Sequence, residues 1–190
     1  IELWLTPPVD DAKTWAYQFI GNAYGAIFDN LQHPELGSTS TGWNGDWKFD
    51  WSPTPADRPE GFWREDYDDS GWGTIPVPSN WQMHGHGVPI YLNIRYPFPE
   101  DPPHIPHDDN PTGAYRHTFE VPADWDGRRI VLHMGAVKSA GWVFVNGDTV
   151  GYTQGSKMPA EFDVTSYVRP GDENLLAEGE RPTSWADLAD

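Results

Sequence analysis

From Trp43 onward, apolar and polar residues alternate with a period of two. In residues 47–51 the apolar members are aromatic, and the same alternation recurs in residues 115–121 and 130–134. Successive side chains of a β-strand point to opposite faces of a sheet, so each run predicts a strand with one buried face. The pattern therefore predicts antiparallel β-structure for this part of the chain.

A tight hairpin is predicted between residues 142–145 and 149–153. Asn146 and Gly147 stand between these runs, and this dipeptide readily adopts the positive φ angles of a two-residue turn. Short strands, turns rich in Pro and Gly, and no long helical pattern after residue 42 favour a mainly β fold. We expect an antiparallel jelly-roll β-sandwich.

Proline and glycine contribute 19 residues each to the 190-residue chain, a proportion also found in disordered proteins. The 11 Trp, 8 Tyr and 8 Phe residues argue against disorder, because they supply an aromatic core. We expect Trp47, Phe49, Trp51 and Phe144 in that core, and two or three Trp residues exposed. Residues 97–113 contain six prolines and are expected to form a long surface loop.

Residues 1–42 follow a different pattern. Between Ile20 and Leu31 the apolar residues recur at helical spacing, and Pro34 follows the end of this run. We expect a short N-terminal helical arm that packs against the following domain, with residues 35–42 as a linker.

The charge balance argues against several classes of partner. Asp and Glu total 29 against 12 Lys and Arg, a formal net charge of −17, so the chain repels nucleic acid and anionic membrane surfaces. The same composition is typical of a salt-adapted proteome, and this explanation stays open. The chain has no cysteine, which excludes disulfides, thiolate metal sites and cysteine nucleophiles.

The sequence also bears on location. No apolar stretch approaches the ~18 residues of a membrane-spanning helix, and residues 1–4 lack the basic flank and apolar run of a signal peptide. Because the first residue is Ile, removal of an upstream leader stays open. We expect a soluble protein, in the bacterial cytoplasm or secreted.

Local catalytic motifs are absent: there is no phosphate-binding glycine loop, no Gly-x-Ser-x-Gly elbow and no His-Glu-x-x-His helix. Imidazole and carboxylate groups that bind divalent metals do occur together in Pro- and Gly-rich loops, although their spacing matches no standard site. They are His84, His86, His104, His107, Asp108 and Asp109. The alternative is that these side chains are solvated or cap turns.

Carboxyl pairs are a second source of chemistry, because glycoside hydrolysis needs only two carboxyl groups, about 5 Å apart for retention or about 6.5–9.5 Å for inversion. The candidates are Asp108, Asp109, Glu161 and Asp163. Asp163 is equally typical of a residue that forms a turn or caps an element, and Glu161 is open to the same interpretation. The sequence does not choose a pair, so no catalytic residue is assigned.

Abundant Trp beside Asp and Asn is typical of carbohydrate binding. An aromatic face packs on the C–H face of a sugar ring, while carboxylate and amide groups hydrogen-bond its hydroxyls. Trp142 and Asp109 are candidates for such contacts.

Five groups of motifs carry a family resemblance, and they occur in a fixed order. They are NGDWKF at 44–49; PSNWQMHG at 78–85 with PIYLNI at 89–94 and YP at 96–97; NPTG at 110–113; VNG at 145–147 with VGY at 150–152; and PAEFD at 159–163. In this order and spacing they resemble the amino-terminal sugar-binding domain of glycoside hydrolase family two β-galactosidases.

The resemblance implies a jelly-roll β-sandwich that packs on a separate catalytic barrel and contributes one loop to its active site. In that loop Asn93 matches the residue that contacts the galactosyl unit, and Ile94 matches the residue that lines the neighbouring wall. Gln154 matches a position beside a peripheral magnesium ion in some relatives. Magnesium and sodium belong to the full-length family, and no cofactor is expected within this chain. The family's catalytic Glu residues lie on the barrel.

Three regions are therefore expected. Residues 1–42 form an arm without a family match, residues 43–177 form the sugar-binding β-sandwich, and residues 178–190 form a tail that departs from the family. The family's sodium site cannot be inferred from this tail. A shortened last strand is expected to leave a sheet edge that the tail or the arm covers.

The leading functional hypothesis is a β-galactoside recognition or scaffolding module without the catalytic barrel, which takes galactosides or related carbohydrates as ligands. One alternative is a small free-standing glycosidase that uses local carboxylates. Another is a structural partner that completes a domain-deleted β-galactosidase in trans. The sequence leaves open whether the chain is itself an enzyme or forms an oligomer.

Overall fold

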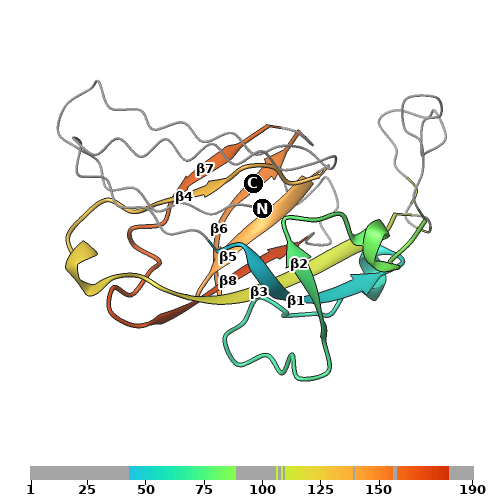
Figure 1. The fold of residues 1–190 in the computed structure, drawn as a ribbon, viewed down its shortest axis with the longest axis horizontal. Helices are drawn as coiled ribbons and strands as arrows, with labels where there is room; N and C mark the ends of the chain where they lie inside the picture. The colour runs from blue at the N-terminus through green and yellow to red at the C-terminus, as the bar shows by residue number, and fades with distance from the viewer. Residues whose placement is uncertain are drawn as a thin grey trace.

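Two antiparallel β-sheets form the structure, a computed structural model that describes residues 43–88, 106, 108, 110–138, 140–155 and 158–179 (Figure 1). The larger sheet has six strands in the spatial order β2-β1-β3-β8-β5-β6, and the smaller consists of β4 and β7. The strands are β1 (Gly45–Ser52), β2 (Gly73–Val77), β3 (Thr112–Glu120), β4 (Val131–Met134), β5 (Ala140–Val145), β6 (Asp148–Gln154), β7 (Ala160–Asp163) and β8 (Glu173–Gly179). Three 3-10 helices connect them: η1 (Pro55–Asp57), η2 (Trp81–His84) and η3 (Ala123–Trp125).

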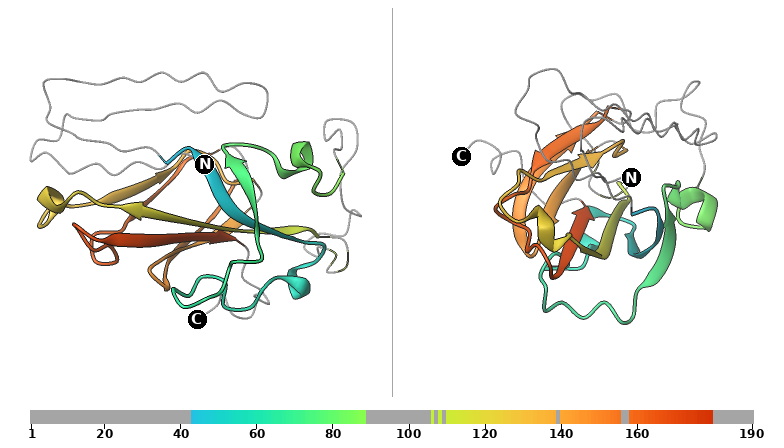
Figure 2. Two further views of the ribbon diagram at one scale, coloured as in Figure 1. Left: turned by 60° about the horizontal axis from the view of Figure 1, so that its bottom comes forward. Right: turned by 60° about the vertical axis from the view of Figure 1, so that its left-hand side comes forward.

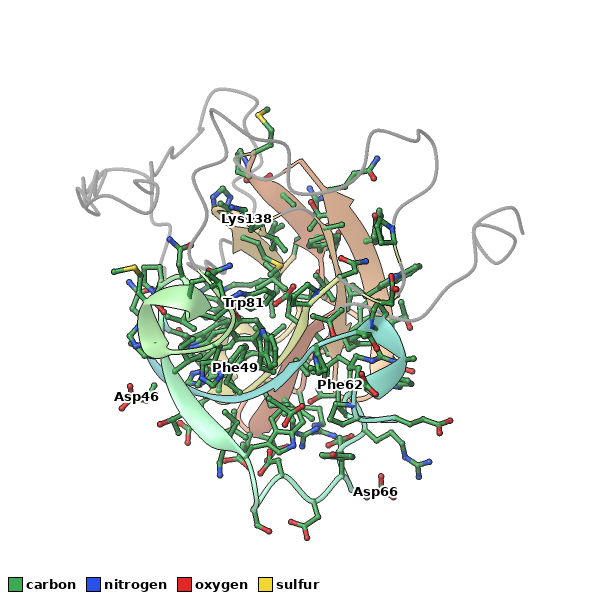
Figure 3. The ribbon with its side chains drawn as sticks, turned by 90° about the vertical axis from the view of Figure 1, so that its right-hand side faces the viewer. Asp46, Phe49, Phe62, Asp66, Trp81 and Lys138 are labelled. Carbon is green, nitrogen blue, oxygen red and sulfur yellow. The ribbon has the colours of Figure 1, made fainter. Side chains whose placement is uncertain are left out.

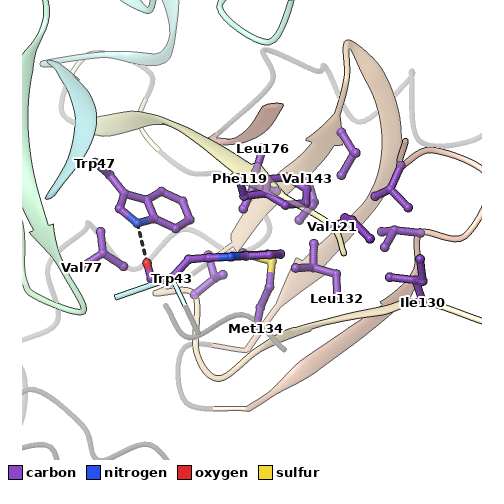
Figure 4. Close-up of a cluster of buried hydrophobic side chains, with 14 of the residues drawn as sticks. Trp43, Trp47, Val77, Phe119, Val121, Ile130, Leu132, Met134, Val143 and Leu176 are labelled. Atoms are coloured by element: carbon purple, nitrogen blue, oxygen red, sulfur yellow. Dashed lines mark hydrogen bonds between the residues drawn. The ribbon is translucent and has the colours of Figure 1, made fainter. Parts of the chain in front are cut away.

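Figure 2 shows how the two sheets lie, and the main core of buried side chains lies between them (Figure 4). Leu132 and Met134 of β4 are buried in the same cluster as Val143 of β5 and Leu176 of β8. At the start of β1 the Trp47 indole Nε1 donates a hydrogen bond of 2.9 Å to the Trp43 carbonyl, which fixes the entry to the strand. The smaller sheet is thereby packed on the larger one, as in a β-sandwich.

The larger sheet is also covered on its other face. The connection between β1 and β2, residues 53–72, lies across this outer face and inserts Phe62, which is fully buried against Phe144. Ala114 and Ala177 complete this second cluster. All residues of β8 after Glu173 are consequently buried, because the strand is covered on both faces.

The predicted strands are confirmed. The alternating run 47–51 lies within β1, the run 115–121 overlaps β3, and the run 130–134 overlaps β4. The hairpin of β5 and β6 turns at Asn146 and Gly147, whose φ angles are +52° and +89°. A β-sandwich is thus observed, while the jelly-roll order stays a prediction. The expected N-terminal helix lies outside the described residues.

The tryptophans of the described part of the chain are buried or half-buried. None of these eight is exposed, and the other three, Trp4, Trp15 and Trp185, lie outside the described residues, so the expectation of two or three exposed Trp residues stays untested for the whole chain. Trp47 and Phe49 are buried as expected, but Trp51 is only half-buried because it stands at the end of β1. No helix in the described ranges has the length and apolar character needed to cross a membrane.

Candidate functional site

The segment that follows β2 forms one end of the sandwich and leads into the loop that carries the predicted sugar contacts. Its helix η2 begins after Asn80, which is extended, and ends at Gly85, whose φ of +88° is left-handed. The backbone N–H of Gly85 donates to the carbonyl of Trp81. The Asn-Trp-Gln-Met-His-Gly motif therefore encodes one short helical turn with a glycine stop.

Trp81 fixes this turn to the sheet. Its ring packs on Phe49 of β1, with centroids 6.1 Å apart (Figure 3). It also occupies the space over Gly113 at the start of β3, where an added Cβ would lie 2.5 Å from Trp81 Cζ3 and 2.8 Å from Phe49 Cε2. Only a residue without a side chain fits there. The Pro-Thr-Gly and Asn-Trp motifs are far apart in sequence but pack together here. We call helix η2, with Phe49 and Gly113 against which Trp81 packs, the η2 unit.

Aromatic contacts continue from this unit into the core. Phe49 contacts His86 edge-on at 5.0 Å and Tyr115 at 4.7 Å. Burial, and then the nearby Glu178 carboxylate, raise the pKa of Tyr115, so its hydroxyl keeps its proton. Burial also raises the pKa of Asp50, against the lowering effect of its 3.4 Å hydrogen bond from Ser52. This end of the sandwich is packed with aromatic side chains and partly desolvated.

The predicted sugar-contacting loop begins directly after this unit. Asn93 and Ile94 follow Val88, the last described residue of the segment, by five and six positions. Both lie outside the described residues, as does Asp109. Their roles remain predictions that rest on the resemblance.

Trp142 and Gln154 lie elsewhere on the sheet. Trp142 of β5 is half-buried against the second cluster, and its ring lies 5.2 Å from Tyr152 of β6. Gln154 is exposed at the end of β6, and its Oε1 accepts a 3.3 Å hydrogen bond from the Tyr152 hydroxyl. Since β3 and β8 separate β5 from β1, the structure does not bring these residues together with the η2 unit.

The carboxylate candidates on β7 are engaged in structural contacts. Glu161 lies opposite His133 of β4, with Oε1 3.0 Å from Nδ1. Asp163 accepts hydrogen bonds from the Thr165 hydroxyl at 2.6 Å and from Arg129 Nε at 2.8 Å. Those bonds lower the pKa of Asp163, whereas a general acid needs a raised pKa. The turn-capping interpretation of Asp163 is confirmed.

The proposed loop metal cluster is only partly described. His84 and Asp108 are exposed, and His86 is half-buried against Phe49. His104, His107 and Asp109 fall outside the described residues. Within the described ranges no group of three or more His, Asp or Glu side chains is placed to hold a metal ion.

Sequence reasoning missed the residue that anchors the outer connection. Arg116 of β3 is buried, and its Nε donates a 2.7 Å hydrogen bond to Asp69 Oδ2. Its Nη1 donates to the carbonyl of Phe62 and, at 2.9 Å, to that of Arg64. The apolar–polar alternation of β3 places Arg116 on the face expected to meet solvent. The one sequence signal for a segment packed over that face is the aromatic and acidic run GFWREDYDDSGW at 61–72.

Comparison with solved structures supports the architecture. The chain is similar to the β-glucuronidase of Ruminococcus gnavus, both in its apo form and in complex with D-glucuronic acid, with a TM-score of 0.52 and 21% sequence identity. The alignment covers 72% of this chain and 20% of that protein. At this identity the likeness shows the fold alone.

Comparison of sequences is more specific. The chain is 48% identical over 136 residues to a β-galactosidase of Pectobacterium atrosepticum, and 44% identical over 142 residues to one of Vibrio cholerae. These alignments cover 70% and 75% of this chain but only 13% and 14% of the relatives. The family model described as "Glycosyl hydrolases family 2, sugar binding domain" matches residues 41–187. The chain belongs to the sugar-binding domain family of the family 2 glycosyl hydrolases.

Proposed function

We propose that this chain is a β-galactoside recognition or scaffolding module that works beside a β-galactosidase catalytic domain. The observation that carries the proposal is a continuous match to β-galactosidases, 48% identical over 136 residues, that spans only 13% of the relative's length. A match of this kind points to one domain of the larger enzymes. The catalytic domain belongs either to the same polypeptide or to a separate one.

The η2 unit supports the recognition part of this proposal. Trp81 packs against Phe49 and Gly113. This packing holds helix η2, from which the chain continues toward Asn93, against the larger sheet. The amide of Asn93 can both donate to and accept from vicinal sugar hydroxyls. A loop that projects from a rigid sheet is a common place for such a contact.

Exposed apolar side chains support the scaffolding part. Met83 and Val88 are each 75% exposed, and both belong to the segment that carries η2. Exposed apolar surface that is contiguous marks a site of contact with a partner. We assign them to the contact with the catalytic domain.

The free-standing glycosidase is the less favoured alternative. Asp163 is held ionised by Thr165 and Arg129, and Glu161 is paired with His133. The lowered pKa of Asp163 is the opposite of what the protonated carboxylic acid of glycoside hydrolysis requires, and the contact with His133 engages Glu161 within the smaller sheet.

Calorimetric titration of the purified chain with galactose, lactose and glucose tests the recognition part. The expected result is heat with galactose and lactose and none with glucose. The absence of heat at millimolar galactose or lactose would contradict the recognition part of the proposal and leave only the scaffolding part. Mixing the chain with a β-galactosidase that lacks its sugar-binding domain tests scaffolding, and no gain of activity or co-elution would remove it.

A further inference from the structure

The sequence contains two Asn-Gly dipeptides, at residues 44–45 and 146–147. In such a dipeptide the backbone nitrogen of the glycine can attack the side-chain amide of the asparagine, because glycine has no side chain to obstruct the approach. The reaction also needs an asparagine side chain and a backbone free to rotate. The two dipeptides differ sharply in this freedom.

Asn146 is locked in the turn between β5 and β6. Its Nδ2 donates to the Tyr167 carbonyl at 2.7 Å and to Asn174 Oδ1 at 2.8 Å. Its Oδ1 accepts from the backbone N–H of Leu175 at 2.8 Å and from Arg169 Nη2 at 3.1 Å. Rotation of this amide toward the next residue would break all four bonds.

Asn44 has none of these restraints. The residue is exposed, and its side chain makes no hydrogen bond to any other residue within the described ranges. Gly45 is exposed as well, with no atom within 4 Å of the position that a Cβ would take. The backbone of Gly45 is held only by the terminal pair of a ladder: Gly45 is the first residue of β1 and lies opposite Val77, and strand ends open at the lowest free-energy cost.

We infer that Asn44 is a site of spontaneous covalent modification, and that the tertiary structure protects Asn146 from the same reaction. Base removes the proton from the backbone nitrogen of Gly45, and this nitrogen then bonds to Cγ of Asn44. The protonated base returns its proton to Nδ2, the Cγ–Nδ2 bond breaks and ammonia leaves, which completes a five-membered succinimide ring. Water opens the ring at either carbonyl, giving Asp or iso-Asp at position 44.

The modification would alter the entry to the larger sheet. Position 44 follows Trp43, whose carbonyl accepts the 2.9 Å hydrogen bond from Trp47 Nε1. An iso-Asp residue lengthens the backbone by one methylene between these two tryptophans. The product also adds one negative charge to a chain whose net charge is already −17.

Incubation of the full 190-residue chain in mildly alkaline buffer, followed by peptide mass spectrometry, tests the inference. We expect the gain of one mass unit at Asn44 to be at least about tenfold faster than at Asn146, since about 1.4 kcal/mol of lost hydrogen bonding already gives a factor of ten. In concentrated urea the two rates should converge, because both residues precede glycine. Asn44→Gln should abolish the first signal, since its longer side chain closes the ring poorly.

A second variant tests the protection directly. Asn174→Ala removes one anchor of Asn146, so modification of Asn146 should accelerate while that of Asn44 stays unchanged. The inference is overturned if the native chain modifies Asn146 as fast as Asn44. It is equally overturned if Asn44 stays intact in the native chain over a period in which urea exposes both residues to the reaction.

Discussion

The imidazole ring of His117 stacks on the indole ring of Trp47, with centroids 4.7 Å apart and planes within 7° of parallel. The contact joins β3 to β1 across the inner face of the larger sheet. Burial lowers the pKa of His117, because the neighbouring apolar groups solvate an imidazolium ion poorly. Protonation of His117 therefore acts directly on a contact of the core.

This contact predicts a loss of stability in mild acid. The folded-state pKa of His117 lies below the unfolded value of about 6.5, so the unfolded state binds the proton more readily. The stability that depends on neutral His117 is complete above the unfolded pKa and is lost as the pH falls below it. We expect the melting temperature to drop between about pH 7 and pH 5 and the drop to shrink in His117→Gln.

Thermal melts of the parent, His117→Gln and His84→Gln across this range check the prediction. His84 is exposed, so its variant should keep the slope of the parent. An unchanged slope in His117→Gln would contradict the assignment. Asp66, Asp68 and Asp163, whose pKa values are lowered, lose their contributions only at more acidic pH.

Gly113→Ala should destabilise the fold. The added methyl group would meet Trp81 at 2.5 Å and Phe49 at 2.8 Å, so one ring must move. Overpacking of this kind costs about 1–3 kcal/mol in the free energy of unfolding, which urea denaturation measures. Gly71→Ala is the matched control, because no atom lies within 4 Å of its would-be Cβ. Equal stability of the two variants would show that Trp81 does not fix the η2 unit.

Arg116→Met should release the connection between β1 and β2. The change removes the 2.7 Å ion pair with Asp69 and the hydrogen bonds to two carbonyls of residues 62–64. Because Asp69 is partly exposed and can regain water, we expect a loss of about 2–4 kcal/mol, somewhat below that of a fully buried pair. Limited proteolysis should then cut within residues 53–72.

The control for this prediction is Arg64→Met. Arg64 also forms an ion pair, with Asp66 at 2.9 Å, but both side chains are exposed. Exposed pairs add little to stability. Proteolysis of both variants at the same rate would mean that Arg116 does not hold the connection.

Asn93→Ala tests the proposed sugar contact. Loss of one or two hydrogen bonds, each worth about 0.5–1.5 kcal/mol, should weaken galactoside binding several-fold in calorimetry. The melting temperature should stay nearly unchanged if the amide serves the ligand. A fall in melting temperature without a selective loss of galactoside binding would instead assign Asn93 to a turn.

Local features of the sequence determined the strands and the hairpin. The alternation around Trp47 and Phe49 reports the direction of each side chain from its own strand, and that direction is set by the backbone itself. Asn146 and Gly147 determine their turn for the same reason, since positive φ angles are a property of the two residues. These predictions needed no knowledge of distant residues.

Only the tertiary structure decided which segment of the chain packs against each face of a β-sheet. Arg116 has the sequence pattern of a solvent-facing residue, yet it is buried because residues 53–72 cross the outer face. Glu161 is paired with His133, 28 residues away, through the register of β4 and β7. Sequence periodicity gives the direction of a side chain but not the segment that lies opposite, because long-range packing selects that segment.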